Sequence, residues 1–381
     1  MSSKPILPGA MLGILGGGQL GRMFTIAART MGYQVMVLDP DSQSPAGKMA
    51  DTHLQADYDD HGALKNMGAA CAAVTTEFEN VPASSLIELS RYCRVAPNAD
   101  AVAIVQDRSR EKSWLRDNGF VTAPFALIDG ADELKDAAAE IGFPAILKVS
   151  RFGYDGKGQF QVGSIAELKT AFAELKGVVC VLEGLVRLDC EISVVLARND
   201  AGECVCFPVG ENRHQHGILD MTTVPARVNA ELSSQAQDQA RAVAEKLDYV
   251  GTLGVEFFVS NGGLLINEIA PRPHNSGHYT LDACVTDQFE QQVRALCGLP
   301  LGDARLLTPV VMVNLLGDVW RPEPDWMALL VHPNIRLHLY GKTEARPGRK
   351  MGHYNCLAAS VEEAESLARA TRASLGISPQ S

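Results

Sequence analysis

The chain has 381 residues, of which 46% are hydrophobic and 21% are charged. This balance is ordinary for a globular protein and excludes a largely disordered one, and the length predicts two or three domains. The formal net charge of −11 argues against a nucleic-acid-binding surface. No apolar run approaches the ~20 residues that cross a bilayer, and the amino-terminal residues show no signal-peptide pattern. We therefore expect a cytoplasmic protein that binds neither nucleic acid nor membrane.

The first hundred residues alternate strands and helices. The expected strands cover 11–15, 35–39, 69–75 and the region of Val95, with helices over 19–31 and 83–91. Such alternation predicts a parallel sheet covered by helices. Pro97-Asn98 then breaks the pattern.

After this break the expected order of elements changes to runs of neighbouring strands with scattered helices. Helices are expected over 106–118, 134–141 and 233–247, and strands over 145–149, 160–162, 178–182, 191–196, 203–209, 255–259 and 263–269. This order predicts an α+β domain with an antiparallel sheet, after an α/β first domain.

A third segment begins near Pro300. Its expected elements are strands over 310–315, 336–340 and 355–359 and a helix over 361–375, either a small domain or an extension of the first one. We place the domain limits at 1–105, 106–300 and 301–381.

Two glycine loops stand out. Gly16, Gly18 and Gly21 form a G-x-G-x-x-G pattern after an apolar run, and Asp39 ends the next apolar run. This is the spacing of a dinucleotide site, and its physics predicts a bound anion without saying which one. The alternative is a tight strand–helix turn that holds no ligand.

The second loop, 153–159, lies between two expected strands and lacks the G-K-[ST] ending of a P-loop. It is either a mobile lid over nucleotide phosphates or a plain flexible hairpin. Lys148, on the strand that enters the loop, favours the lid. Strand centres seldom bury a lysine without a partner, and phosphate oxygens would be such a partner.

Two later strands carry acidic residues at apolar positions. Glu256 and Glu268 both lie inside apolar runs, where a carboxylate is costly unless it is paired or metal-bound. A divalent cation between them, Mg²⁺ or Mn²⁺ in its place, would remove their repulsion. Salt bridges to Lys or Arg are the alternative.

Other candidates follow along the chain. Arg272 and His274 could clamp a small oxyanion, whereas His278 is more typical of a satisfied structural histidine. Lys342 and the basic run 346–350 indicate either a phosphate site or a solvated basic face.

The nine cysteines are odd in number and scattered, which favours free thiols; only Cys204 and Cys206 form a close pair, without further soft ligands for a zinc ion.

Together these residues resemble the ATP-grasp superfamily and, within it, the family of N5-carboxyaminoimidazole ribonucleotide synthetases. The motifs run in family order over nearly the whole chain, and GYDGKGQ and APRPHNSGH are the specific ones. The matching segments are GGGQLGRM (16–23), TEFENV (76–81), Asp107-Arg108, FGYDGKGQ (152–159), Glu183, Glu191, INEIAPRPHNSGHYT (266–280) and RPGRKMGHYN (346–355). Many ATP-grasp enzymes carry Glu-x-Asn on the last strand; here Ala270 stands two residues after Glu268, so no third protein ligand is assigned.

The resemblance implies a Rossmann-like pre-ATP-grasp domain, an ATP-grasp domain with a mobile lid, and a small carboxy-terminal domain. It also implies the nucleotide site. Arg108 and Lys148 would contact ATP phosphates, and Glu256 and Glu268 would hold Mg²⁺. The remaining nucleotide contacts would come from the lid residues Gly153, Tyr154, Asp155, Gly156, Lys157, Gly158 and Gln159, from the adenine hinge Glu183, Gly184, Leu185 and Val186, from Glu191 at the ribose, and from His214 and Asn267.

The implied reaction joins ATP, bicarbonate and 5-aminoimidazole ribonucleotide through carboxyphosphate. Lys148 would offset charge on the transferred phosphoryl group, Arg272 and His274 would position bicarbonate, and Asp155 would contact the amine. The ribonucleotide would be held by Gly18, Gln19, Leu20, Glu79, Asp155, Lys342 and Arg349. The family also implies a homodimer whose product passes to a mutase.

Three other functions stay open at this point. An NAD-dependent dehydrogenase explains residues 13–39 and nothing beyond them. A non-catalytic nucleotide-binding module would not need both strand glutamates. Another ATP-grasp ligase, acting on formate or an amino acid, is the most serious competitor, and the segments 272–278 and 346–353 argue against it.

Overall fold

The computed structural model describes residues 4–153, 157–320 and 322–377. The amino-terminal part is a five-stranded parallel sheet in the order β3-β2-β1-β4-β5. Its strands are β1 (Met11–Leu15), β2 (Gln34–Leu38), β3 (Thr52–Leu54), β4 (Ala73–Thr76) and β5 (Arg94–Val95), and its helices are α1 (Gln19–Thr30), α2 (His61–Ala70) and α3 (Ala83–Leu89). The predicted parallel sheet is thus confirmed.

One expected strand of this sheet was placed too early. The expected strand 69–75 begins only at Ala73, because α2 continues to Ala70 and buries Leu64 and Met67 on its inner face. Cys71 ends the helix, and the chain turns there into β4.

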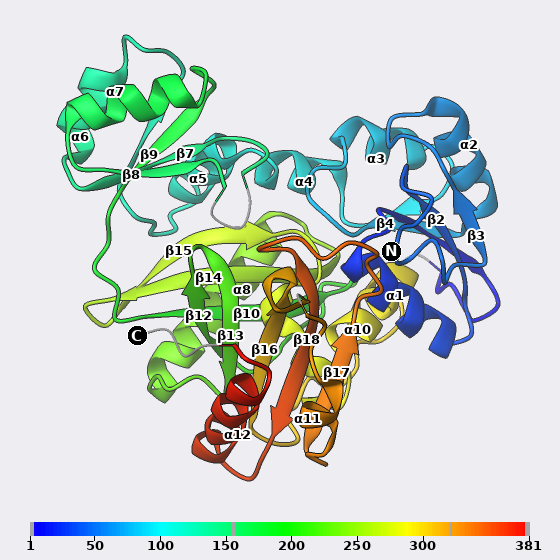
Figure 1. Ribbon diagram of the computed structural model, residues 1–381. Helices are drawn as coiled ribbons and strands as arrows, with labels where there is room; N and C mark the ends of the chain where they lie inside the picture. Colours follow the sequence, from blue (N-terminus) through cyan, green and yellow to red (C-terminus); the bar gives the residue numbers. More distant parts are fainter. Residues whose placement is uncertain (1–3, 154–156, 321, 378–381) are drawn as a thin grey trace.

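A small four-stranded antiparallel sheet, β6-β9-β7-β8, lies at the upper left of Figure 1. Its strands are β6 (Phe125–Ile128), β7 (Ala145–Val149), β8 (Gln159–Val162) and β9 (Cys180–Gly184), with the helices α6 (Leu134–Ile141) and α7 (Ile165–Glu174) packed on it. The second glycine loop lies in sequence between β7 and β8 of this sheet. Helices α4 (Ala99–Val105) and α5 (Arg108–Asp117) join this unit to the amino-terminal part (Figure 1).

The large sheet has nine strands in the order β15-β14-β10-β12-β13-β16-β18-β17, with β11 paired to β10. Its strands are β10 (Cys190–Arg198), β11 (Cys204–Cys206), β12 (Gly210–Gln215), β13 (Ile218–Val224), β14 (Gly251–Ser260), β15 (Gly263–Ala270), β16 (Val310–Leu316), β17 (Ile335–Leu339) and β18 (Lys350–Leu357). Because β16 pairs with β13, the strands of the third segment extend the central sheet and form no sheet of their own among the described residues.

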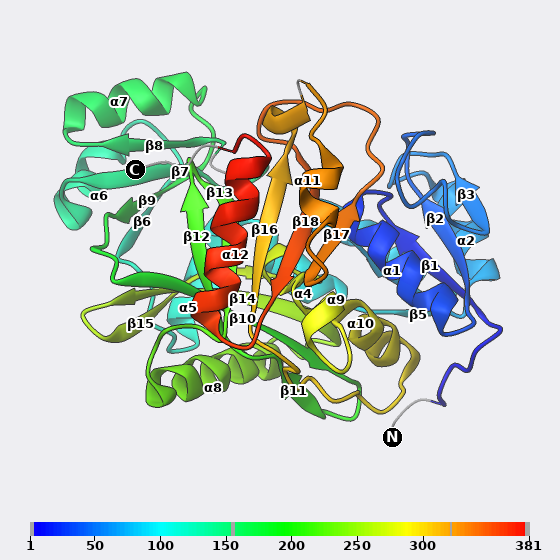
Figure 2. The same ribbon diagram turned by 60° about the horizontal axis from the view of Figure 1, so that its bottom comes forward.

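Several helices cover the large sheet, as Figure 2 shows from below. Helix α8 (Ala230–Lys246) buries a stripe that includes Leu232, Ala236 and Val243 in the same core as β10 and β14. Helix α12 (Val361–Ser374) covers β16 and β18. The remaining helical elements are α9 (Thr280–Ala283), α10 (Gln288–Cys297), α11 (Trp326–Leu330), η1 (Asn275–Gly277) and η2 (Gly317–Trp320).

Helix α10 ties the amino-terminal sheet to the central one. Phe289 and Val293 share a buried core with Phe24 of α1, and the Gln292 side chain donates to Thr75 Oγ1 across 2.8 Å while accepting from Thr252 N. Helix α10 therefore links β4 of the amino-terminal sheet to β14 of the central sheet. None of the described helices is long and apolar enough to span a membrane.

Candidate active site

Two carboxylates face each other at the edge of the central sheet. Glu256 on β14 and Glu268 on β15 are register partners, next to a β-bulge at Glu256/Phe257. Burial, and then the charge of Glu268, raise the pKa of Glu256 to about 7. The two predicted metal ligands are therefore brought together, at a cost that a cation would relieve.

This donor set fits Mg²⁺ only with help from a bound molecule. Oxygen ligands are the ones that Mg²⁺ prefers, and it is usually held by one or two carboxylates plus substrate phosphates. No group of three or more His, Cys, Asp or Glu side chains arranged for a metal occurs within the described residues. The buried Oδ1 atom of Asn267, the residue before Glu268, also has no hydrogen-bond partner among the described residues. The site thus fits a cation that takes some of its ligands from the two carboxylates and the others from bound phosphates.

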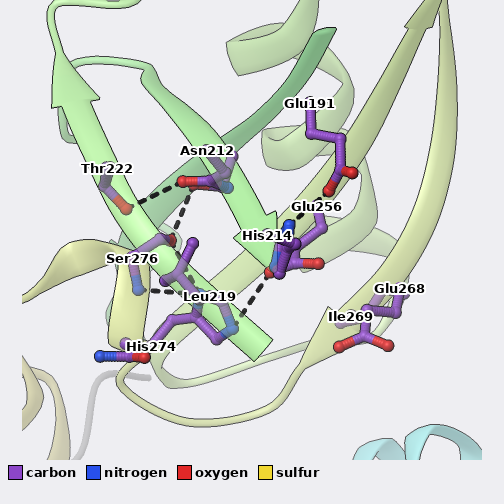
Figure 3. A network of polar contacts seen from close by, with 12 residues as sticks. Glu191, Asn212, His214, Leu219, Thr222, Glu256, Glu268, Ile269, His274 and Ser276 are labelled. Atoms are coloured by element: carbon purple, nitrogen blue, oxygen red, sulfur yellow. Dashed lines mark hydrogen bonds and ion pairs between the residues drawn. The ribbon is translucent and has the colours of Figure 1, made fainter. Parts of the chain in front are cut away.

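A histidine lies beside these carboxylates. Figure 3 shows His214 of β12 gathered with Glu191 of β10 and Glu256 of β14. Its Nδ1 lies 2.6 Å from Glu191 Oε2. Burial alone would lower the pKa of His214, but the bond to Glu191 and the charge of Glu256 outweigh it and raise the pKa to about 8. His214 is therefore protonated at neutral pH and partly balances the acidic cluster.

A buried carboxylate collects three cations next to this site. Glu183 Oε2 accepts from Lys148 Nζ at 2.8 Å, and Glu183 Oε1 lies 3.6 Å from Lys112 Nζ and 3.9 Å from Arg108. Burial would raise the pKa of Glu183, but the charges of Lys112, Lys148 and Arg108 hold it at about 2. Arg108 also reaches Glu268 at 3.4 Å. The cluster thus joins the small sheet to the carboxylate pair.

This cluster revises the sequence argument about Lys148. The lysine is 9% exposed and already has a protein partner, so its burial does not by itself require phosphate. The Glu183 side chain likewise points to the cations, so the other groups of the expected hinge 183–186 are the ones that can face a base. In that segment Gly184 N donates to Pro124 O and Leu185 N to Pro144 O.

Two residues of the cluster were missed from the sequence. Lys112 is fully buried and donates to Asn267 O at 2.9 Å, and the buried Glu111 accepts from Ile269 N at 2.5 Å. Burial raises the pKa of Glu111 to about 7 despite the nearby Arg108. The signal was present: Arg108, Glu111 and Lys112 fall on one face at helical spacing in the expected helix 106–118.

The first glycine loop binds carboxylates of its own chain. Gly17 N donates to Asp39 Oδ2 and Gly21 N to Glu77 Oε2, each at 2.6 Å, and Gly18 N also donates to Glu77. Chiefly because of its burial, the pKa of Glu77 is raised. The expectation that these amides face a ligand anion is therefore not met in this structure, where side chains take that place.

The carboxy-terminal segment nevertheless reaches this loop. Lys342 Nζ donates to Gln19 Oε1 at 2.7 Å and to Lys350 O at 2.6 Å. Leu20 is buried under the loop, and Arg349, half-buried, donates to Glu344 O. Lys342 and Gln19 are 323 residues apart in sequence, so the fold brings the carboxy-terminal basic segment to the first glycine loop.

Arg272 contacts the amino-terminal part of the chain, and His274 contacts the carboxylate pair of the central sheet. Arg272 Nε donates to Glu79 Oε2 at 2.6 Å, which joins two predicted site residues in one ion pair. His274 Nδ1 lies 2.8 Å from Ser276 Oγ, and Nε2 lies 3.5 Å from Glu256 Oε1. Burial, followed by the charge of Arg272, lowers the pKa of His274 well below its usual range. His274 is therefore neutral, and Arg272 carries the positive charge.

Two further expectations concern single residues and the lid. His278 is fully buried and its Nδ1 lies 3.0 Å from Gln288 Nε2, as expected of a structural histidine, but its Nε2 has no hydrogen-bond partner among the described residues and is therefore not satisfied. Of the lid, Gly153, Lys157, Gly158 and Gln159 are described; Gly158 O accepts from Val149 N. The predicted lid and substrate residues Tyr154, Asp155 and Gly156 lie outside the described residues.

Comparison with known proteins identifies the fold and the family. Residues 10–106 match the ribonucleotide synthetase preATP-grasp domain, residues 113–289 the ATP-grasp domain, and residues 310–367 the phosphoribosylaminoimidazole carboxylase C-terminal domain. The N5-carboxyaminoimidazole ribonucleotide synthase of Bacillus subtilis is 44% identical over 354 residues, which cover 93% of each chain. The chain belongs to the N5-carboxyaminoimidazole ribonucleotide synthase family.

Other members of the N5-carboxyaminoimidazole ribonucleotide synthase family are similar to this chain in sequence and in fold. The Brucella melitensis enzyme is 45% identical over 93% of this chain and 98% of its own. A crystal structure of an ADP complex of the synthetase superposes with a TM-score of 0.93 at 42% identity, covering 97% and 98% of the two chains. The Aspergillus clavatus synthase, solved with ADP and 5-aminoimidazole ribonucleotide, gives 0.89 at 31% identity over 96% and 98%.

Family membership decides between the functions left open by the sequence. The predicted three-part architecture and the resemblance to this family are confirmed. The dehydrogenase interpretation of the first glycine loop is set aside, because the same segment falls in the preATP-grasp domain.

Proposed function

We propose that this chain carboxylates 5-aminoimidazole ribonucleotide, using ATP and bicarbonate, and releases N5-carboxyaminoimidazole ribonucleotide, ADP and phosphate in purine biosynthesis. One observation carries the proposal: the Glu256–Glu268 pair stands beside the Arg108–Lys148 cluster in a chain of this family. A cation-binding carboxylate pair next to fixed cations is what transfer of a phosphoryl group from MgATP needs.

The nucleotide would lie between the small sheet and the central sheet. Arg108 and Lys148 would contact its phosphates, and the lid 153–159 would cover them. When bound, Mg²⁺ would supply charge neutralisation between the phosphates and Glu256 and Glu268. The base and ribose would meet the backbone of 183–186 and the side chains of Glu191, His214 and Asn267.

Bicarbonate would bind near Arg272 and His274. Arg272 keeps its charge at every accessible pH and can hold an oxyanion by paired hydrogen bonds, whereas the neutral His274 can donate one hydrogen bond without repelling a cation. Attack of bicarbonate on the γ-phosphate of ATP would give carboxyphosphate and ADP. Closure of the lid would protect this labile intermediate from water.

The ribonucleotide would bind across the first glycine loop. Gly18, Gln19, Leu20, Glu79, Lys342 and Arg349 would hold it, with its 5′-phosphate at the lysine and the arginine. Because Glu77 and Asp39 already accept from the loop amides, side-chain cations would carry more of the phosphate recognition than the loop backbone. Asp155 would contact the amine that becomes carboxylated.

Further parts of the proposal concern the setting of the enzyme. We propose a cytoplasmic homodimer, which hands its product to a mutase that moves the carboxyl group. The product is a carbamate and therefore prone to decarboxylation, so a short path to the next enzyme would protect it.

Heavy-oxygen transfer tests the proposed chemistry. Bicarbonate labelled with heavy oxygen should pass one labelled atom to the released phosphate, because its oxygen attacks the γ-phosphate. Labelled phosphate that forms only when the ribonucleotide is present supports the proposal. Unlabelled phosphate, or turnover with formate or an amino acid in place of bicarbonate, would overturn it.

A further inference from the structure

The imidazole ring of His274 contacts the protein through both of its nitrogen atoms. Its Nδ1 atom lies 2.8 Å from Ser276 Oγ and 3.4 Å from Ser276 N, and its Nε2 atom lies 3.5 Å from Glu256 Oε1. Figure 3 shows the ring between these two residues. One edge of the imidazole therefore faces the η1 segment, and the other edge faces the carboxylate pair.

The contacts at Nδ1 decide which ring nitrogen carries the proton. A backbone N–H group can only donate, and the N–H of Ser276 donates to Nδ1 of His274, so Nδ1 must present its lone pair. A proton on Nδ1 would face this N–H group and leave it without an acceptor in a buried position. The structure therefore fits the neutral ring with its proton on Nε2, and it fits neither the other tautomer nor the imidazolium ion.

A second buried serine completes the arrangement around Nδ1. Ser193 Oγ on β10 donates to Ser276 Oγ across 2.7 Å, and both serines are buried. Because Ser276 Oγ accepts from Ser193, its own proton is available for Nδ1 of His274. Two donors of Ser276, the hydroxyl and the backbone N–H, thus converge on Nδ1, and Ser193 orients the first of them.

A glycine and a glutamine fix the position of the ring. Gly254 lies two residues before Glu256 on β14, so both residues are on the same face of the strand. A Cβ atom on Gly254 would lie 2.8 Å from His274 Cβ and 2.9 Å from its Cγ, so a side chain here would displace the ring. Gln288 Oε1 accepts from His274 N at 2.8 Å, and Gln288 Nε2 donates to His274 O at 2.9 Å. The ring is therefore held beside Glu256 from both its backbone and its face.

We propose that Ser276 is a positioning residue for the bicarbonate step, because it keeps the proton of His274 on Nε2, and that Ser193 supports it. This inference rests on the proposed function, in which His274 donates a hydrogen bond to bicarbonate. The Nε2–H group then points into the site before the substrate arrives, so no reorganisation is needed when the anion binds. In the opposite tautomer, Nε2 would present a lone pair to an anion, and the contact would be repulsive.

Nitrogen NMR of protein with ¹⁵N-labelled histidine tests the tautomer without any reaction. The protonated and the unprotonated nitrogen of a neutral imidazole have well-separated chemical shifts. In the native protein, His274 should show a protonated Nε2 and an unprotonated Nδ1, and its signals are assigned by their loss in His274→Gln. In Ser276→Ala only the longer backbone contact remains, so the two shifts should move toward each other as the second tautomer becomes populated. A proton on Nδ1 in the native protein, or unchanged shifts in Ser276→Ala, would overturn the proposal.

Steady-state kinetics test the consequence for the reaction. Ser276→Ala should raise the KM for bicarbonate about 10-fold, the value of one hydrogen bond, and Ser193→Ala should raise it less. The KM values for ATP and for 5-aminoimidazole ribonucleotide should stay nearly constant in both variants. A general loss of packing would instead change all three KM values together.

A buried serine elsewhere in the chain is the matched control. Ser85 on α3 is buried, and its Oγ has no hydrogen-bond partner among the described residues. Ser85→Ala therefore removes a buried hydroxyl of the same size and should change neither the His274 shifts nor the three KM values. An unchanged bicarbonate KM in Ser276→Ala, or equal increases in all three KM values, would overturn the proposal. Turnover of the native protein without bicarbonate would instead overturn the proposed function, and the NMR measurement would still decide which nitrogen Ser276 keeps unprotonated.

Discussion

Glu256 on β14 and Glu268 on β15 are register partners, so a buried carboxylate lies opposite a second carboxylate across the ladder. Arg108 lies 3.4 Å from Glu268 and the charge of His214 acts on Glu256, yet burial and the charge of Glu268 still raise the pKa of Glu256 to about 7. Such an arrangement is unfavourable in the empty protein and becomes favourable when a divalent cation is shared. The first two predictions follow from this pair.

Glu268→Gln should abolish turnover that depends on Mg²⁺ and ATP while leaving the fold intact. The amide keeps the size of the side chain but loses the charge that would hold the cation, so ADP release should fall roughly 100-fold or more. Circular dichroism should be unchanged, because the Glu268 side chain is 39% exposed. Glu363→Gln, at the exposed start of α12, is the control. Near-native activity of Glu268→Gln would contradict the metal role.

In the metal-free protein, Glu256 and Glu111 should each contribute less to the free energy of unfolding as the pH rises from about 4.5 to about 7. Burial raises the pKa of Glu256 and Glu111 to about 7, so the folded state binds their protons more tightly than the unfolded state does. Each group's contribution is present at the acidic end and disappears as the pH passes its folded pKa, with an upper limit on the order of 3 kcal/mol.

Urea unfolding at several pH values measures this effect. The buried His274, His278 and His353, whose pKa values are lowered, act in the opposite direction in both proteins, so the comparison is between the native protein and Glu256→Gln. The free energy of unfolding of the native protein, relative to that of Glu256→Gln, should fall as the pH rises through this range. Mg²⁺ with ADP should reduce the contribution of Glu256 to the pH dependence of the native protein, because a bound cation keeps Glu256 ionised at lower pH. Parallel curves for the variant and the native protein would be inconsistent with the raised pKa of Glu256.

Lys112→Met should destabilise the protein by about 3–5 kcal/mol, the usual cost of removing one partner from a buried ion pair. The lysine is fully buried and joins Glu183 to Asn267 O, so its loss leaves both with one partner fewer. Denaturant unfolding gives the change. Arg116→Met, on the same helix but 61% exposed, should have little effect. A similar effect of both variants would show that the buried cluster is not what stabilises this region.

Lys342→Gln should raise the KM for 5-aminoimidazole ribonucleotide roughly 10- to 100-fold, the value of one or two charge-assisted hydrogen bonds. Arg349→Gln should act in the same direction, and kcat at saturation should change much less in both. Arg346→Gln is the control, since Arg346 is exposed and paired with Glu344 at 3.2 Å. If kcat falls while the KM stays constant, the basic cluster does not bind the ribonucleotide phosphate.

The sequence predicted the elements with strong periodicity. β1, β7, α6 and the Glu256 and Glu268 strands lie where alternation and apolar runs placed them. The expected strand 203–209 is instead limited to β11 (Cys204–Cys206), and Pro208, which has no N–H to donate to a ladder, follows it. Strand β12, which begins at Gly210, was not predicted. Helix α10 was missed, because its polar residues Gln288, Gln291 and Gln292 are buried at a domain contact that no local pattern reveals.

The site was predictable in its residue types and less so in their partners. The motifs indicated Lys148, Glu183 and Arg272, but each of them is paired with a residue distant in sequence. Glu183 is the buried anion of a cation cluster, and Arg272 is paired with Glu79. The carboxylates on the first glycine loop were missed for the same reason: Glu77 and Gly18 are 59 residues apart and meet only in the folded sheet.

The dependence of ADP release on both other substrates tests the proposed function most directly. ADP formed from MgATP should be measured with bicarbonate alone, with 5-aminoimidazole ribonucleotide alone, and with both together. Rapid release that requires both substrates, with one carboxylated ribonucleotide for each ADP, is the predicted result. Release that proceeds at the same rate without the ribonucleotide would contradict the substrate assignment.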